Sequence, residues 1–426
     1  MELDAVVLFD ALSQQAIAGL TAGERAVRVA RRAGAGRVLV VDRVRDQLAA
    51  WRGARRAPLL VIRADQLVHP PLVVPLVAAA PGDGLAIAVG PDGEYAGALL
   101  ATGDHADRVI AALGRGEGDT SIAQGATLRV PHGEIARHPI ATPDERRAAH
   151  RLLYRILIKP QDNAITRHLY RPVSSPLTRL LVWTPITPNQ LSYLVAVIVA
   201  IGCWLTASAS QARVVAGTAM ILAAAYVDCC DGEIARLKLM SSRYGAWVDT
   251  VIDELSSIGY MAALGWHCHL ALGPRYFGPR DLGFDPWLAA IALGVATYGG
   301  AMYGIYYNLI VVVGSANSQD YAGRIEAVPG ARPGSVRLRP LALPAPSAPR
   351  TGWIAAIATY APYVVRRDFI SWAALVLAAV GATALLFAGL ILGGVVTFAI
   401  VVTDHVKLRR MRRAIVRAGQ VLEPAS

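Results

Sequence analysis

The chain has 426 residues, of which 54% are hydrophobic and only 17% are charged, and its formal net charge is +11. Soluble domains usually carry about a quarter charged residues, so this composition excludes a disordered chain, a fibre and an entirely soluble enzyme. A basic chain with an apolar excess favours an anionic lipid surface over nucleic acid as its partner. The four cysteines are too few for a disulfide framework in a chain of this length.

The first 142 residues alternate β-rich runs with helical stretches. We expect a helix at Ala22–Ala33, and strands at Ala5–Phe9, Arg37–Asp42, Leu59–Ile62 and Leu85–Val89. Strands that alternate with helices predict a Rossmann-like α/β domain with a mostly parallel sheet. No basic segment followed by an apolar core opens the sequence, so we expect no signal peptide and a cytoplasmic location for this domain.

Residues 143–188 are expected to connect this domain to the apolar half of the chain. A helix rich in Arg and Leu is predicted at residues 143–158, and a break follows at 159–163. The stretch 163–185 mixes Arg with Leu, Tyr and Trp, which is typical of an amphipathic helix at a membrane interface. A solvated linker is the alternative.

Apolar runs long enough to cross a membrane dominate the second half. A spanning helix needs about 20 apolar residues. The stretch 369–403 carries no charge and is too long for one span, so it predicts two helices with a tight turn near Ala388-Gly389. The sequence therefore predicts six transmembrane helices within residues 189–410, followed by a basic tail at 411–426. The six expected spans lie near 190–208, 213–237, 245–271, 288–313, 369–386 and 388–405.

Lys and Arg gather in alternate loops of this predicted domain. They follow spans two, four and six, whereas the opposite loops carry few or balanced charges. Because positive loops stay on the cytoplasmic side, this pattern predicts a multi-pass protein of the inner (plasma) membrane with both termini in the cytoplasm. The loop 314–352 is rich in Pro, Ser, Gly and Arg and is expected to be irregular.

Four carboxylates lie at the cytoplasmic ends of spans two and three, where they are costly to bury. Asp228 and Asp231 are three residues apart, and Asp249 and Asp253 are four apart, so each pair shares one helix face. The short connecting loop allows the two faces to converge. Such a cluster requires cations, and hard oxygen ligands favour two Mg²⁺ or Mn²⁺ ions, with Ca²⁺ able to occupy the same site. Two metals beside an open space suit phosphate chemistry.

Small residues accompany these carboxylates. Gly232 and Ala235 follow Asp228 by four and seven positions, and Gly245 precedes Asp249 by four. Their lack of bulk lets a ligand approach the helix backbones, although close packing of two helices is the alternative. Arg236 is suited to hold a diphosphate; its alternatives are snorkelling to the interface and pairing with Glu233.

The segment 228–253 matches the pattern D-x2-D-G-x2-A-R-x8-G-x3-D-x3-D at every position and resembles the signature of the CDP-alcohol phosphotransferases. Two further stretches also resemble that family, Thr187-Pro188-Asn189 before span one and Arg366-Arg367-Asp368-Phe369 at the start of span five. Together the resemblance covers roughly residues 155–415. Members of the family move a substituted phosphate from a CDP-alcohol to an acceptor hydroxyl and release CMP.

The resemblance implies a role for each matching residue. Asp228, Asp231, Asp249 and Asp253 would bind the metals, and Asp253 would also be the general base. The donor would be CDP-diacylglycerol or a similar CDP-linked lipid, and an inositol phosphate is the expected acceptor. The residues expected to contact nucleotide or substrate are Gly232, Ala235, Arg236, Gly245, Asn189, Arg366 and Arg367.

The N-terminal domain resembles nucleotidyltransferases in the order of its elements, and some inositol-phosphodiester-forming relatives carry a fused cytidylyltransferase. The family's glycine-rich loop with Arg and Lys is absent here, since the first strand leads into Leu8-Phe9-Asp10-Ala11-Leu12. Asp65 is either a metal aspartate or a surface residue. We therefore expect an inactive domain that serves stability or assembly.

Two alternatives exist for the function of the whole chain. One is a bifunctional enzyme that makes its own CDP-alcohol, and the other is an ion-coupled transporter. A homodimer is left open.

Overall fold

The computed structural model describes residues 2–42, 46–158, 162, 164–273, 283–314, 321–330, 332, 334–341 and 367–423. The chain divides into two compact units. Unit 1 comprises Met1–Gln161, Ser175–Ile186 and Glu233–Met240. Unit 2 comprises Asp162–Ser174, Thr187–Gly232 and Ser241–Ser426.

A mixed six-stranded sheet forms the centre of unit 1, with strand order β4-β1-β5-β8-β7-β9. The pairs β1–β4, β1–β5 and β7–β9 are parallel, whereas β8 runs antiparallel to both β5 and β7. The predicted α/β architecture is thus confirmed, and β8 is a strand that the sequence reading missed. The strands span Leu3–Leu8 (β1), Ala35–Val41 (β4), Leu59–Arg63 (β5), Gly84–Val89 (β7), Tyr95–Thr102 (β8) and Leu128–Pro131 (β9).

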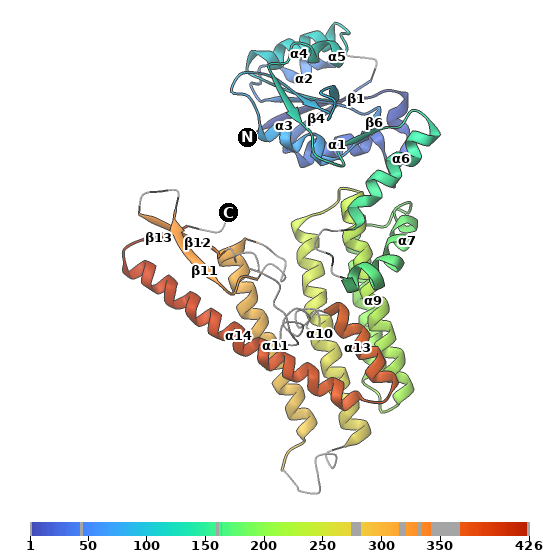
Figure 1. Cartoon of the computed structure of the whole chain (residues 1–426), viewed down its shortest axis with the longest axis vertical. Coiled ribbons are helices and arrows are strands. Elements are labelled where there is room, and N and C mark those ends of the chain that lie inside the picture. The colour runs from blue at the N-terminus through green and yellow to red at the C-terminus, as the bar shows by residue number, and fades with distance from the viewer. Residues whose placement is uncertain are drawn as a thin grey trace, which may run out of the picture. The chain divides into compact units, whose positions relative to one another are not determined.

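Helices cover both faces of this sheet (Figure 1). α1 (Ala22–Arg32) and α3 (Val74–Ala78) pack on one face. The other face is covered by α2 (Gln47–Arg52), α4 (Asp104–Gly114) and α5 (Asp119–Ala123). Burial on both faces explains why the central strands read as nearly continuous apolar runs.

Shorter elements complete unit 1. The strands β2 and β3 form a small hairpin, and β6 pairs with β10. The predicted connecting helix is present as α6 (Pro143–Tyr154). The bounds of the short elements are Ala16–Ile17 (β2), Leu20–Thr21 (β3), Gln66–Val68 (β6), Arg137–Pro139 (β10), and single helical turns at Ala11–Gln14, Pro70–Leu72 and Arg155–Leu157.

A buried arginine of α1 holds the short segment 233–240 within unit 1. The Arg25 guanidinium donates to the carbonyl oxygens of Leu237 at 2.8 Å and Ile17 at 3.0 Å. Burial lowers the pKa of Arg25 to about 10, so it stays charged at neutral pH. Arg28 donates likewise to the Lys238 carbonyl oxygen at 2.7 Å. Unit 1 therefore uses two cations to satisfy carbonyl groups at the end of a helix, where they lack helical partners.

Long helices dominate unit 2, and the last of them crosses its neighbours obliquely (Figure 1). Their common core contains Tyr260, Leu264, Trp287, Ala378 and Phe387. A π-helical turn at Thr166–Tyr170 leads into α7 (Arg171–Leu181) ahead of them. The long helices are α8 (Pro188–Thr206), α9 (Gln211–Leu237), α10 (Arg243–Leu272), α11 (Pro286–Asn308, extended by a π turn at Leu309–Val313), α13 (Arg367–Ala379) and α14 (Thr383–Arg417).

Four helices of the described chain are long and apolar enough to cross a membrane: α8, α9, α11 with its extension, and α14. A fifth apolar helix, Asp368–Ala379, is shorter. α10 matches the predicted third span in position, but it is not among the four. These helices make the chain a membrane protein, while the predicted number of six spans and the orientation of the termini stay predictions.

Two predicted features of the C-terminal region are wrong. The turn between the last two helices lies at residues 380–382 and not near Ala388-Gly389, which is inside α14. Gly381 supplies the positive φ of +78° that this turn requires. The loop 314–352 was expected to be irregular, yet its described part contains the antiparallel strands β11 (Ile325–Pro329) and β12 (Ser335–Pro340).

The alternation within β12 explains that hairpin. Val336 and Leu338 are buried, whereas Arg337 and Arg339 are not, so one face of the strand joins a core with Leu408 and Ile415 of α14. The final strand β13 (Val421–Leu422) adds in parallel to β12. The expected basic tail is therefore helical through Arg417 and then pairs with this hairpin.

Candidate functional site

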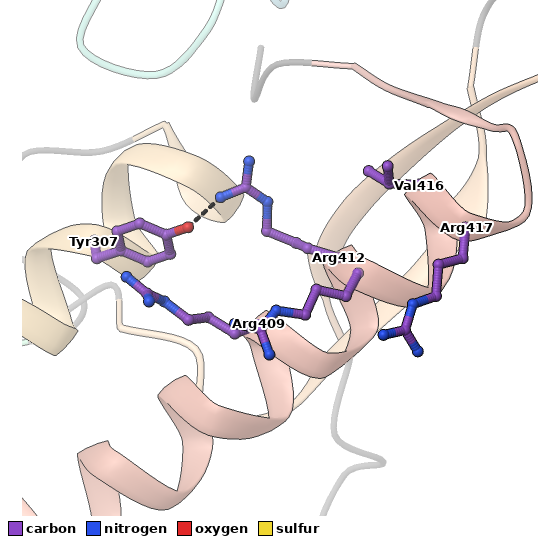
Figure 2. Close-up of a pocket in the computed structure, with 6 residues that line it drawn as sticks. Tyr307, Arg409, Arg412, Val416 and Arg417 are labelled. Carbon is purple, nitrogen blue, oxygen red and sulfur yellow. Dashed lines mark hydrogen bonds between the residues drawn. The ribbon is translucent and has the colours of Figure 1, made fainter.

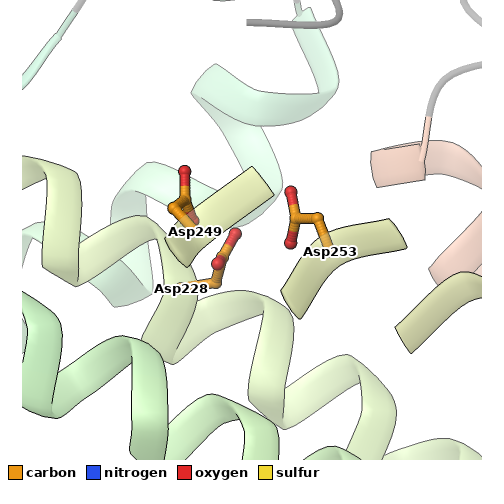
Figure 3. A group of neighbouring side chains, drawn as sticks. All are labelled: Asp228, Asp249 and Asp253. Carbon is orange, nitrogen blue, oxygen red and sulfur yellow. The ribbon is translucent and has the colours of Figure 1, made fainter. Parts of the chain in front are cut away.

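Three of the four predicted aspartates come together between α9 and α10. Asp228 from α9 and Asp249 and Asp253 from α10 each offer one carboxylate oxygen, and these oxygens lie within 4.8 Å of one another. Figure 3 shows the three side chains gathered at this point. Each residue is half-buried. Asp249 and Asp253 are four residues apart, so they share one face of α10. The short connection between α9 and α10 turns this face toward Asp228, and the sequence pattern therefore accounts for the convergence.

Asp231 is more deeply buried than these three aspartates. It is 6% exposed, and its Oδ2 accepts a hydrogen bond of 2.6 Å from the hydroxyl of Ser192 on α8. The group of three oxygens described above does not include it. Sequence reasoning missed Ser192, although a hydroxyl three residues after Asn189 in an otherwise apolar span was a usable signal.

The three carboxylates fit a hard divalent cation. Mg²⁺, Mn²⁺ and Ca²⁺ prefer oxygen ligands at about 2.0–2.6 Å. Two oxygens on opposite sides of such an ion are therefore about 4–5 Å apart, which agrees with the observed limit of 4.8 Å. The donor set contains no nitrogen or sulfur, so it does not favour zinc.

Gly245 and Asn189 lie in close contact beside this group. A Cβ atom on Gly245 would stand 2.9 Å from the Asn189 Oδ1 atom and 3.1 Å from the Ser242 hydroxyl oxygen. Ser242 caps α10, since its hydroxyl accepts from the Gly245 amide at 2.9 Å. The absence of a side chain at position 245 therefore lets the start of α8 approach the start of α10.

The other predicted contact residues have less defined surroundings. Gly232, Ala235 and Arg236 are half-buried on the last turns of α9. Arg366 lies outside the described residues, and Arg367 is described only as the first residue of α13.

The start of α13 is anchored through Asp368, the residue that follows these two arginines. Its Oδ2 accepts from the Thr166 hydroxyl at 2.6 Å. Its backbone carbonyl accepts from the Tyr170 hydroxyl at 3.1 Å. These two bonds fix the helix end at which the predicted arginines stand.

A cavity of about 460 Å³ lies between the ends of α11 and α14 (Figure 2). The Arg412 guanidinium donates to the Tyr307 hydroxyl, and the Arg409 guanidinium stands 5.6 Å from the centre of the same ring. No carboxylate is among the described residues that line it, so the cavity is strongly positive. The lining residues are Tyr307, Arg409, Arg412, Arg413, Val416 and Arg417.

In unit 1, Asp65 is engaged by a neighbouring cation. The Arg63 Nε donates to its Oδ1 at 3.1 Å, and the Nη2 of the same residue contacts its Oδ2. This pairing raises the pKa of Arg63. Asp65 therefore belongs to an ion pair that stabilises the fold, and this geometry argues against the interpretation of Asp65 as a metal ligand.

Comparison with known proteins agrees with this site. Residues 185–330 match the family CDP-alcohol phosphatidyltransferase. The chain is also similar to three proteins that are each named bifunctional IPC transferase and DIPP synthase. With that of Aquifex aeolicus it shares 31% identity over 170 residues, which is 39% of this chain and 36% of the relative.

The two other relatives match over similar lengths. Identity with the Thermococcus kodakarensis protein is 34% over 129 residues, covering 30% of this chain and 28% of the relative. Identity with the Rubrobacter xylanophilus protein is 33% over 139 residues, covering 32% and 31%. The chain thus spans about a third of the length of the curated relatives it matches. The matched region holds all four signature aspartates, and the C-terminal half of the chain therefore contains a CDP-alcohol phosphatidyltransferase domain.

Proposed function

We propose that this chain is a divalent-metal-dependent phosphotransferase of the inner membrane, with both termini in the cytoplasm. It would transfer a substituted phosphate from a CDP-alcohol to an acceptor hydroxyl and release CMP. The donor would be CDP-diacylglycerol or a similar CDP-linked lipid. The observation that supports this most directly is the convergence of Asp228, Asp249 and Asp253 within the matched domain.

The aspartates would have two different roles, metal binding and proton transfer. Asp228 and Asp249, with Asp231 beside them, would hold two Mg²⁺ or Mn²⁺ ions. When bound, the ions supply charge stabilisation for the diphosphate and the departing CMP. Asp253 would accept the proton of the acceptor hydroxyl. That oxygen then bonds to the phosphorus carrying the donor alcohol, while the bond from this phosphorus to the CMP oxygen breaks and CMP leaves with the electron pair.

The small residues and Arg236 would bind the nucleotide. Gly232, Ala235 and Gly245 leave the helix backbones accessible, which allows close approach of a diphosphate. Arg236 would pair with its phosphate oxygens through a fork of N–H donors. Asn189, whose Oδ1 atom lies close to the Gly245 backbone, would border the same space.

We propose an inositol phosphate as the acceptor. The names of the similar proteins support this choice. The arginine-lined cavity supports it independently, because guanidinium groups bind phosphate in a bidentate manner. Tyr307 of that cavity directly follows Tyr306, which hydrogen-bonds to the neighbour of Asp253. Along α11, this cavity therefore begins next to the residue that bonds to Glu254. Arg366 and Arg367 would add further charge for the phosphate.

The proposed domain boundaries follow from this assignment. Residues 1–142 would form an inactive nucleotidyltransferase-like domain, 143–188 the linker with its juxtamembrane helix, 189–410 the transferase domain and 411–426 the basic tail. The pairing of Asp65 with Arg63 supports inactivity of the first domain. The word bifunctional in the relatives' names favours the alternative, a first domain that makes the CDP-alcohol.

An assay of CMP release tests the transferase assignment. The full chain in detergent, with Mg²⁺, CDP-diacylglycerol or other CDP-linked donors and inositol phosphate, should release CMP, and chelation should stop the reaction. Asp253→Asn should lower the rate by about 10³-fold while Mg²⁺ still raises the melting temperature. Asp404→Asn is the matched control, because Asp404 pairs with Lys407 at 3.2 Å in the same unit. Full activity of Asp253→Asn would contradict the proposed base.

A further inference from the structure

Glu254 is a fifth carboxylate next to the aspartate group, and two tyrosines hold it. Its Oε2 accepts a hydrogen bond of 2.6 Å from the Tyr298 hydroxyl, and its Oε1 accepts one of 2.8 Å from the Tyr306 hydroxyl. Both tyrosines belong to α11, whereas Glu254 belongs to α10. We name this arrangement of Glu254, Tyr298 and Tyr306 the tyrosine clamp.

The Glu254 side chain faces α11. Consecutive residues on an α-helix are about 100° apart, so the helix that directs Asp253 toward Asp228 directs Glu254 toward α11. Both oxygens of Glu254 are occupied by hydroxyl donors of that helix. The ring of Tyr306 also lies 5.8 Å from the ring of Trp247, which gives α11 a second contact with α10.

The energetics of this arrangement favour a fixed geometry. Removing a carboxylate from water is costly unless it has hydrogen-bond partners. Hydrogen bonds to an ionised group are roughly twice as strong as neutral ones, and they are stronger still where water is scarce. Rotation of α10 about its axis would break both bonds, so the clamp opposes rotation at the residue adjacent to Asp253.

We infer that Glu254 is a positioning residue: the tyrosine clamp fixes the rotation of α10 and thereby holds Asp249 and Asp253 opposite Asp228. This inference rests on the proposed function. A misplacement of about 1 Å in a reacting group can lower a rate about 100-fold, so a clamp that adds no ligand of its own still controls the reaction.

Kinetic measurements on clamp variants of the full chain test the inference. In the double variant Tyr298→Phe/Tyr306→Phe, which keeps both rings, kcat should fall about 100-fold. The Mg²⁺ concentration for half-maximal activity should rise about 10-fold, and the KM for the CDP-linked donor should stay within 2-fold. Glu254→Leu should behave in the same way.

Glu254→Gln distinguishes positioning from direct participation. Glutamine still accepts from one tyrosine and donates to the other, so its kcat should stay within about 5-fold of wild type, with an unchanged pH profile. If Glu254 were a metal ligand or a base, Glu254→Gln would be as harmful as Glu254→Leu, and that result would overturn the inference. Tyr303→Phe is the matched control, because Tyr303 lies on α11 with its ring against Tyr307 and His405.

The outcomes also separate this inference from the proposed function. If Asp253→Asn is inactive but the clamp variants have normal kcat and metal dependence, only the clamp is wrong. If Asp253→Asn keeps full activity, the proposed function itself fails.

Discussion

Two groups of carboxylates in this chain have opposite surroundings. In unit 1, Asp4 is 2% exposed and pairs with the equally buried Arg52, whose Nη1 lies 3.2 Å from its Oδ2. In unit 2, Asp228, Asp249 and Asp253 gather within 4.8 Å of one another. A guanidinium supplies the counter-charge of the carboxylate beside it, whereas three carboxylate oxygens close together form a set of ligands for a divalent cation.

This difference separates structural acids from candidate catalytic acids. Asp65 and Asp4 each lie against an arginine, so each carboxylate has its counter-charge within unit 1. Repulsion among like charges costs stability, and folds retain it mainly where function requires it. The contrast therefore supports chemistry in unit 2 and a supporting role for unit 1.

The largest expected effect comes from breaking the aspartate group. Asp249→Asn should lower CMP release by at least about 10³-fold, because it removes a carboxylate that the proposed metals require. Addition of Mg²⁺ should raise the melting temperature of the wild-type chain but not that of the variant. Isothermal titration with Mg²⁺ in detergent measures the same loss. A variant that keeps a tenth of the activity would show that these carboxylates do not act through a metal.

An intermediate effect is expected from the buried pair in unit 1. Arg52→Met leaves Asp4 buried without its partner and should lower the free energy of unfolding by about 3–5 kcal/mol. Hydrogen exchange of the strands β1 and β4 measures this loss. The exposed Arg56–Asp104 pair provides the control, since Arg56→Met should change stability by less than about 1 kcal/mol. The double variant Asp4→Val/Arg52→Leu should recover much of the lost stability; if it does not, the pair has a role beyond charge neutralisation.

The sequence predicted the convergence of three aspartates better than the details of the fold around them. The spacings around Asp228 and Asp249 determine which residues share a helix face, so three aspartates meet as expected. The same rule places Asp231 with them, which stays a prediction; its hydrogen bond to the Ser192 hydroxyl was not predicted. Helix periodicity determines the direction of a side chain relative to its own helix and contains no information about partners on other helices.

The tyrosine clamp was missed for the same reason. Glu254 follows Asp253 in the printed sequence, but only tertiary packing brings Tyr298 and Tyr306 to it from 44 and 52 residues away. The turn after α13 was misplaced because several glycines, Gly381 and Gly389 among them, were compatible with a break in a uniformly apolar stretch. Only the first has the positive φ that ends a helix.

The smallest expected effect concerns Asp65. With a CDP-linked donor already supplied, Asp65→Asn should leave CMP release within 2-fold of wild type, because this carboxylate is paired with Arg63 in the unit that lacks the aspartate group. When CTP and an alcohol phosphate replace the CDP-linked donor, neither the wild type nor the variant should form a CDP-alcohol. Formation of that product by the wild type and its loss in Asp65→Asn would instead make unit 1 a second enzyme. The contrast between neutralised and clustered carboxylates would then fail as a guide to where this chain performs chemistry.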